Sequence, residues 1–499
     1  MATTTPTTKP AGAAALFGSL LLISSAPALA AKDWNISPSL GITTSYTSNL
    51  ELTADNEIDS MVLDITPGIS FNRQGARATV SFDYSAHIIG YSASEGDDRI
   101  DHRLNTALST ELVEEHLFLD ARASYSQQLI DRRDASNGDN INASDSFSDT
   151  ATIVITPSWR QRIGKYTEIG VEASYDAVLF QDANDDSEGT SYSFFVDTEN
   201  SPSKLVWALS AGQSNSNPDQ SDSIKEDSAR LTLRYRFSPQ FVPNITAGWV
   251  DNHLESTTDD RADSGSFWGA GLQWRPNPRN TVDLSYNSRL QTNNSYGLTY
   301  QHRRKHSTWS LVYQESISSI RQQLLDGVSI GSLICPPGSV DFDQCTFVDS
   351  QTTVVPQPGD QVFDVNVPVA SLVNDRFIQQ TTRANIVAGK GKSRITTGIF
   401  YSEREFQATA ETEQEQGIDM GWSLRLSRRG TASANWNWSK LESDGVPNDY
   451  FSRISVSYDR RLTPKSSLTG SVRYSERHSG DATREFEDWT AVVSFRKTF

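Results

Sequence analysis

Apolar side chains stand at every second position along most of this chain, with small or polar residues between them. A period of two places alternate side chains on opposite faces of a β-strand. The pattern recurs in about 22 segments of roughly ten residues, and no stretch beyond residue 30 has convincing helical periodicity. Clear examples are Met61, Leu63 and Ile65, then Ala229, Leu231, Leu233 and Tyr235, then Ile418, Met420, Trp422 and Leu424. The chain is therefore predicted to be all-β.

The connections between these segments alternate in length. Short connections such as 72–75, 162–165 and 427–430 are separated by long stretches rich in Asp, Asn and Ser, such as 129–146 and 251–265. A barrel threaded through a membrane sorts its connections in this way, because only one end needs tight turns. We predict a single large antiparallel transmembrane β-barrel of about 22 strands (range about 18–24), with short periplasmic turns and long extracellular loops.

Aromatic residues are sorted by strand end, as a membrane barrel requires. One predicted belt lies near the long loops and the other near the short turns, and together they flank an aliphatic band. The first belt contains Tyr46, Tyr125, Tyr175, Trp249, Tyr313, Tyr401, Trp438 and Tyr474, and the second contains Phe71, Trp159, Phe237, Trp274 and Phe499. This sorting favours two membrane interfaces.

The opposite faces of the same strands are polar and carry charges of both signs. Such side chains cannot form a dry core of this size, but they can line water. The lumen-facing candidates are Arg230, Arg234, Arg236, Asp283, Arg289, Arg453, Asp459 and Arg473. The first three could form a ladder that favours anionic solutes, or they could pair with Asp or Glu on neighbouring strands. The strand register decides between these readings, and the sequence does not give it.

The last strand has an aromatic residue as its final position. Trp489, Phe495 and Phe499 lie on one predicted face, and Phe499 ends the chain. We expect this strand to pair with the first one, which removes both open edges of the sheet. The ending resembles the C-terminal signature of bacterial outer-membrane proteins. That resemblance implies recognition by the barrel-assembly machinery of a Gram-negative bacterium.

Residues 1–30 have the features of a cleaved signal peptide. Lys9 precedes an apolar stretch at 11–25, and Ala28 and Ala30 provide a small-x-small cleavage site. The alternative is an N-terminal membrane anchor, for which the apolar stretch is short. We therefore expect residues 31–499 to form the exported barrel in the outer membrane.

Composition narrows the range of partners. The 499 residues carry a formal net charge of -18, which argues against nucleic acid as a partner. The expected partners at this point are outer-membrane lipid and lipopolysaccharide and the barrel-assembly machinery.

Residues 317–374 form the longest connection, and they differ in composition from the acidic loops. Connections this long are functional or disordered, and we predict that this one folds over or into the mouth as a constriction or lid. The alternative is an ordered external loop without a gating role. Cys335 and Cys345 lie within it, and in an exported protein we expect them to form a local disulfide.

Signals for catalysis or metal binding are weak. The sequence lacks a Gly-x-Ser-x-Gly motif, and the segment 389–393 (GKGKS) lacks the upstream glycine of a phosphate-binding loop. Residues 182–189 resemble the start of a calcium loop, but Ser187 replaces its turn glycine. We predict no enzyme activity, no catalytic or metal-binding residues and no cofactor.

The segments 37–52 (SPSLGITTSYTSNLEL) and 65–85 (ITPGISFNRQGARATVSFDYS) carry a family resemblance. The N-terminal third resembles uncharacterised outer-membrane barrels associated with PEP-CTERM/exosortase systems, within a broader β-barrel porin superfamily. The resemblance implies a role in moving or presenting exopolysaccharide, and it transfers no functional residues.

The predicted function is an outer-membrane channel linked to exopolysaccharide export or surface polysaccharide handling. The alternative is a structural or adhesive barrel that does not conduct, with loops that bind polysaccharide or lipopolysaccharide. An energised uptake receptor would require a plug domain of more than about a hundred residues before the barrel. Because strand patterning begins at Trp34, that third reading is not favoured.

Overall fold

The computed structural model describes most of the region after the first 33 residues. The described residues are 34–129, 141–142, 147–181, 186–219, 223–255, 261–288, 294–326, 329–335, 346–349, 361–366, 376–407 and 410–499. The predicted signal peptide, together with its cleavage site, lies outside them, as do Arg289 and Cys345.

One sheet contains 22 strands. Its first eleven are β1 (Asn35–Thr47), β2 (Ser60–Gln74), β3 (Ala78–Tyr91), β4 (Arg99–Val113), β5 (Leu117–Leu129), β6 (Phe147–Ile163), β7 (Thr167–Phe180), β8 (Ser187–Asp197), β9 (Leu205–Pro218), β10 (Ser223–Tyr235) and β11 (Phe241–Glu255). The others are β12 (Arg261–Asn277), β13 (Asn280–Asn287), β14 (Ser295–Arg303), β15 (Ser307–Ser319), β19 (Arg376–Lys390), β20 (Ser393–Phe406), β21 (Thr412–Ser427), β22 (Gly430–Ser443), β23 (Val446–Thr463), β24 (Ser466–Ser479) and β25 (Phe486–Thr498).

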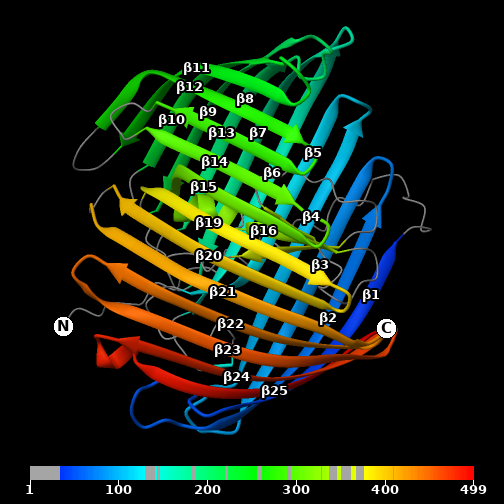
Figure 1. Cartoon of the computed structure of the whole chain (residues 1–499), viewed down its shortest axis with the longest axis vertical. Coiled ribbons are helices and arrows are strands. Elements are labelled where there is room, and N and C mark those ends of the chain that lie inside the picture. The colour runs from blue at the N-terminus through cyan, green and yellow to red at the C-terminus, as the bar shows by residue number, and fades with distance from the viewer. Residues whose placement is uncertain are drawn as a thin grey trace, which may run out of the picture.

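The sheet is a closed antiparallel barrel. Each strand pairs with the next one along the chain, and β15 pairs with β19 across the longest connection. Strand β1 pairs with β2 on one side, where Ile42 faces Ile65, and with β25 on the other, where Ile42 faces Phe495. Figure 1 shows β1 in blue and β25 in red lying side by side at the closure. The predicted all-β barrel of about 22 strands is confirmed.

Side-chain alternation gives the barrel an apolar outer face. Large apolar residues exposed on it include Ile42 on β1, Ile399 on β20 and Val493 on β25. The next residue along each of these strands faces inward. At two of the three positions it is polar, as Thr43 and Ser494, and at the third it is the aromatic Phe400. Exposed apolar residues of this number are stable only against lipid, so the barrel spans a membrane.

Aromatic residues mark both ends of the outer face. Tyr46, Tyr175 and Trp249 are exposed toward the ends of their strands that lead into long loops. Trp159, Trp274 and Phe499 are exposed toward the ends that lead into short turns or to the C-terminus. At two of the short turns, Gly164 and Gly391 adopt a positive φ of 67°, a conformation that glycine adopts without strain.

The connection between β15 and β19 contains regular structure of its own. A seven-residue helix, α2 (Ile320–Asp326), follows β15 directly. A separate three-stranded sheet contains β16 (Ser329–Cys335), β17 (Thr346–Asp349) and β18 (Gln361–Asn366), with β16 in the middle. The sequence did not predict this helix, because two helical turns are too short for a period to be visible. The predicted disulfide cannot be followed, since Cys345 lies outside the described residues.

A further short helix caps the loop between β24 and β25. This 3₁₀ helix, η3 (Ala482–Arg484), begins after Asp481, whose carboxylate accepts hydrogen bonds from the backbone nitrogen and the hydroxyl of Thr483. These hydrogen bonds hold the pKa of Asp481 below its ordinary value.

Candidate functional site

Charged side chains on the inward face pair across neighbouring strands. Arg383 on β19 contacts Asp419 on β21 at 3.0 Å, and Asn437 on β22 donates a hydrogen bond to the same carboxylate. On the N-terminal side, the Nδ1 atom of His87 lies 2.9 Å from a carboxylate oxygen of Asp64. The wall of the lumen is therefore a polar surface in which many charges are locally balanced.

Two of these inward pairs are buried. Arg404 lies 3.1 Å from Glu413, and Arg477 lies 2.6 Å from Asp449. All four side chains are less than a tenth exposed. Removing one partner of such a pair leaves an uncompensated buried charge, so these contacts fix the local wall structure.

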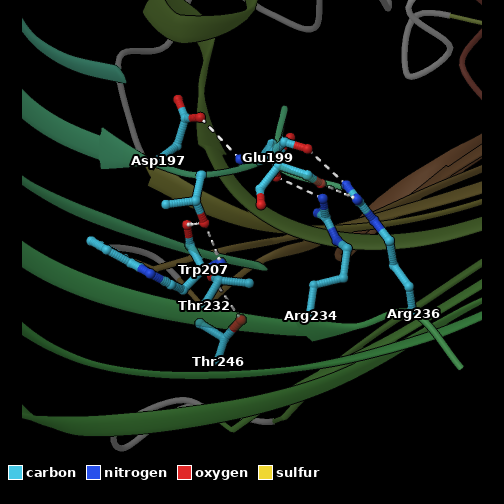
Figure 2. A network of polar contacts seen from close by, with 9 residues as sticks. Asp197, Glu199, Trp207, Thr232, Arg234, Arg236 and Thr246 are labelled. Atoms are coloured by element: carbon cyan, nitrogen blue, oxygen red, sulfur yellow. Dashed lines mark hydrogen bonds and ion pairs between the residues drawn. The ribbon is translucent and has the colours of Figure 1, made fainter. Parts of the chain in front are cut away.

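The predicted arginines Arg230 and Arg234 on β10, and Arg236 just after it, face inward but have different partners. Arg234 donates to the Glu199 carboxylate at 2.6 Å, and Arg236 donates to the carbonyl oxygens of Ser201 and Glu199 at 2.5 and 2.7 Å. Figure 2 shows both guanidinium groups converging on the 198–204 turn. Arg230 lies over the ring of Phe267 at 5.4 Å. Arg234 and Arg236 thus hold a turn as well as facing the lumen.

Three other predicted lumen residues lie on the neighbouring strands β23 and β24. Arg473 donates to Thr490 at 3.1 Å, Asp459 accepts from Thr469 at 2.8 Å, and Arg453 lies over the Phe451 ring. Arg289 lies outside the described residues. The described residues among these candidates therefore lie in two separate parts of the wall, one over β10 to β13 and one over β23 and β24.

A small recess lies in the wall near the short turns. It has a volume of about 260 Å³ and is lined by Arg234, Val242, Asn244, Leu272, Gln273, Asp283 and Leu284. The predicted residues Arg234 and Asp283 therefore share this recess. It is an indentation of the channel wall rather than an enclosed binding pocket.

The helix α2 packs on inward-facing residues of the barrel. Its side chains Ile320 and Leu324 form a buried apolar cluster with Val178 on β7 and Phe377 on β19. Phe180 and Phe406 pack against the same cluster. Strands β7 and β19 are not neighbours in the sheet, so α2 joins two separate parts of the wall inside the long-loop mouth.

Polar contacts fix α2 at both parts of the wall. Arg321 forms an ion pair with Asp176 on β7, and Gln323 donates to Gln379 on β19 at 2.8 Å. Burial lowers the pKa of Arg321 to about 10, which leaves the guanidinium protonated at neutral pH. Gly189 on β8 leaves room for this contact, because a Cβ there would lie 2.0 Å from an Arg321 nitrogen. We call α2 with these contacts the mouth brace.

Sequence reasoning missed the mouth brace. Ile320 and Leu324 are spaced as on one helical face, and the hydroxyl of Ser319 accepts a hydrogen bond from the backbone nitrogen of Gln322, as at a helix N-terminus. The sequence shows only the apolar spacing and the position of Ser319, over a stretch too short to identify a helix. Neither indicates that Arg321 would meet Asp176, 145 residues earlier in the chain.

Two further observations concern the described residues as a whole. Among the described helices, none has the length and apolar character needed to cross a membrane. Within the same residues, His, Cys, Asp and Glu side chains form no group of three or more that could hold a metal ion.

Comparisons with known proteins give a fold but no family. No family model and no curated protein matches the sequence. Among solved structures, the FrpB iron transporter from Neisseria meningitidis (F5-1 variant) matches with a TM-score of 0.54 and 9% identity, covering 94% of this chain and 82% of that one. The siderophore receptor PirA from Acinetobacter baumannii matches with a TM-score of 0.53 and 8% identity, covering 93% and 80%. At these identities the likeness establishes a shared barrel fold.

Proposed function

We propose that this protein is an outer-membrane channel with a polar lumen. The observation that carries the proposal is the inward face, where paired and unpaired polar groups replace the apolar packing of a closed core. An arrangement such as Arg383, Asp419 and Asn437 interacts with water and with polar solutes at little desolvation cost. The shared barrel fold of the receptors named above supports the same location in the cell.

We further propose that the channel serves exopolysaccharide export or surface polysaccharide handling. The support is the resemblance of segments 37–52 and 65–85 to barrels associated with exopolysaccharide systems. Its partners are then outer-membrane lipid and lipopolysaccharide, the barrel-assembly machinery and the polysaccharide or its export complex. The role proposed is passage rather than catalysis.

The mouth brace supports a second candidate function. Because α2 joins β7 and β19 inside the mouth, it reduces the free cross-section there. A barrel held in this state without opening would be a structural or adhesive protein whose long loops bind polysaccharide or lipopolysaccharide.

Conductance separates the two candidates. The refolded protein, whose folded form is recognised by its heat-modifiable gel mobility, is placed in a planar bilayer with and without polysaccharide fragments. Stable current steps that fragments block support the export channel. A folded barrel that stays silent, even when α2 is released from the wall, contradicts it and favours the structural candidate.

A further inference from the structure

In one arc of the short-turn end, all the charged side chains are basic. It consists of the segments 271–282, 300–309, 386–397, 422–433, 460–468 and 494–499, which connect or end the strands from β12 to β25. These segments contain sixteen Lys and Arg residues and no Asp or Glu. We call them the basic rim. A chain with a net charge of -18 has thus concentrated positive charge at one end.

Many of the basic side chains are exposed at the turns. They are Arg275, Arg279, Arg303, Arg304, Lys305, Lys390, Lys392, Arg428, Arg429, Arg460, Lys465, Arg496 and Lys497. The exposure leaves them accessible to a ligand that approaches from the short-turn side.

Each segment also places an arginine on the inward face. Trp274, Ile395 and Leu426 are exposed on the outer face, so alternation turns the adjacent Arg275, Arg394 and Arg425 inward. By the same alternation Arg303, Arg461 and Arg496 face inward at their strand ends. Arg461 and Arg496 lie in one row, because each is paired with Ser467 of β24 between them. The positive charge therefore surrounds part of the opening of the lumen.

Backbone hydrogen bonds hold neighbouring basic turns together. The amide of Arg303 donates to the carbonyl of Arg279, that of Arg425 to Lys392, and that of Arg461 to Arg429, each at 2.8 Å. Like charges on neighbouring turns repel each other unless solvent, salt or a ligand screens them. A bound polyanion relieves this repulsion.

The rest of the short-turn end is balanced by acidic residues. Arg77 pairs with Glu114 at 2.6 Å, and Arg234 pairs with Glu199 at 2.6 Å. Arg162 lies 3.8 Å from Glu168. The excess of basic over acidic residues is thus a property of the β12–β25 arc and not of the whole end.

The inward residues beside the arginines have side chains that can form hydrogen bonds with carbohydrate. Two positions further into the barrel from each inward arginine, the side chain is an amide or a hydroxyl in five of six cases. These residues are Gln273, Gln301, Thr396, Ser423 and Ser494, with Asp459 as the sixth. Protein partners are usually anchored by buried aromatic and apolar side chains, which this row does not contain. Amides and hydroxyls form hydrogen bonds with sugar hydroxyls.

We infer that the basic rim binds an acidic polysaccharide, a chain bearing carboxylate groups, at the periplasmic opening of the lumen. The arc crosses eleven strands, so it extends over roughly 50 Å at about 4.8 Å per strand. A chain can contact several turns at once, and the contacts then reinforce each other. This inference names the substrate class and rests on the proposed export function.

Binding to the refolded protein in detergent micelles tests the inference without requiring conduction. The probe is fluorescent polygalacturonate, and neutral dextran of similar length is the comparison. Binding should occur for polygalacturonate alone and weaken as salt rises. The double variant Lys305→Glu with Lys392→Glu should weaken it about tenfold or more, because it replaces attraction by repulsion at two turns.

A matched variant changes the same net charge outside the basic rim. Lys165 and Lys204 are exposed at other turns of the same end, and Lys165→Glu with Lys204→Glu should change the affinity by less than about twofold. Equal weakening by both variants, or no weakening by either, overturns the inference. Equally tight binding of poly-L-glutamate overturns the assignment to polysaccharide. A barrel that binds the probe but never conducts refutes the channel function alone.

Discussion

At the scale of single residues, Asp488 connects the two strands that close the barrel. Its carboxylate is fully buried and accepts hydrogen bonds from the hydroxyls of Thr47 and Thr490 at 2.7 and 2.6 Å. The backbone nitrogens of Ser48 and Asn49 also donate to it. One side chain thus satisfies donors from β1, from the residues that follow β1 and from β25.

Replacing Asp488 by alanine should destabilise the closed barrel. The change leaves several buried donors without an acceptor, which corresponds to about 3 kcal/mol in the free energy of unfolding. Urea unfolding of the refolded protein in micelles, followed by tryptophan fluorescence, measures the loss. Asp488→Asn is the control, because its amide oxygen still accepts hydrogen bonds and the loss should be smaller. An alanine variant as stable as the unmodified protein contradicts the role given to Asp488.

At the scale of elements, the strands could be predicted from the sequence and α2 could not. A strand such as β21 repeats its alternation over many residues, so its two faces are visible without knowing its neighbours. The α2 helix depends on a packing partner, since Ile320 and Leu324 are buried only against Val178 and Phe377. The pairing of Arg234 with Glu199 was also hidden, because it depends on the path of the intervening turn.

Releasing α2 should enlarge the conducting path. Leu324→Asp places a charge in the apolar cluster, and the helix avoids this desolvation penalty by leaving the wall. The single-channel conductance should therefore rise. Gln322→Asp is the matched control, because Gln322 is an exposed residue of the same helix. Equal conductance in both variants contradicts a constricting role for the mouth brace.

Deleting residues 330–360 tests the rest of the same connection. We predict a higher single-channel conductance if this segment constricts the mouth, because its removal shortens the connection that α2 begins. The measurement is made in the same bilayers. An unchanged conductance confines any constriction to α2 itself.

The end of β25 makes an assembly prediction. Phe499 is exposed on the outer face, so it adds little to the packing of the finished barrel. Phe499→Ala should lower the amount of heat-modifiable protein in the outer membrane of cells, because it removes the proposed signal for the assembly machinery. The refolded variant should keep the urea midpoint of the unmodified protein. A loss of stability without a loss of assembly contradicts this assignment.

At the scale of the whole molecule, charge is unevenly divided between the ends. The long-loop connections are acidic, as in the segments 92–101 and 251–265, whereas the basic rim lies at the other end. The composition alone gives only the net charge of the chain, and it does not show that the two ends of the barrel differ in charge. The separation follows from the alternation of short and long connections, which the sequence does show.

The division of charge predicts anion selectivity, whereas the net charge of -18 taken alone would favour cations. In a bilayer with a KCl gradient, the reversal potential should indicate preference for chloride, because the inward arginines line the opening. Lys305→Glu with Lys392→Glu should shift the reversal potential toward potassium. A cation-selective pore in the unmodified protein contradicts this prediction.

The pairing of β1 with β25 has a consequence for the time course of folding. Thr43 and Ser494, whose hydroxyls lie 2.9 Å apart, are separated by 451 residues along the chain. Bringing such distant segments together is entropically unfavourable, and contacts of this kind form slowly. The other pairs of neighbouring strands, apart from β15 and β19, are close together along the chain. The pairing of β1 with β25 is therefore expected to form last. Until it does, β1 keeps an open edge, and the lifetime of that intermediate sets how long the nascent barrel needs protection from aggregation.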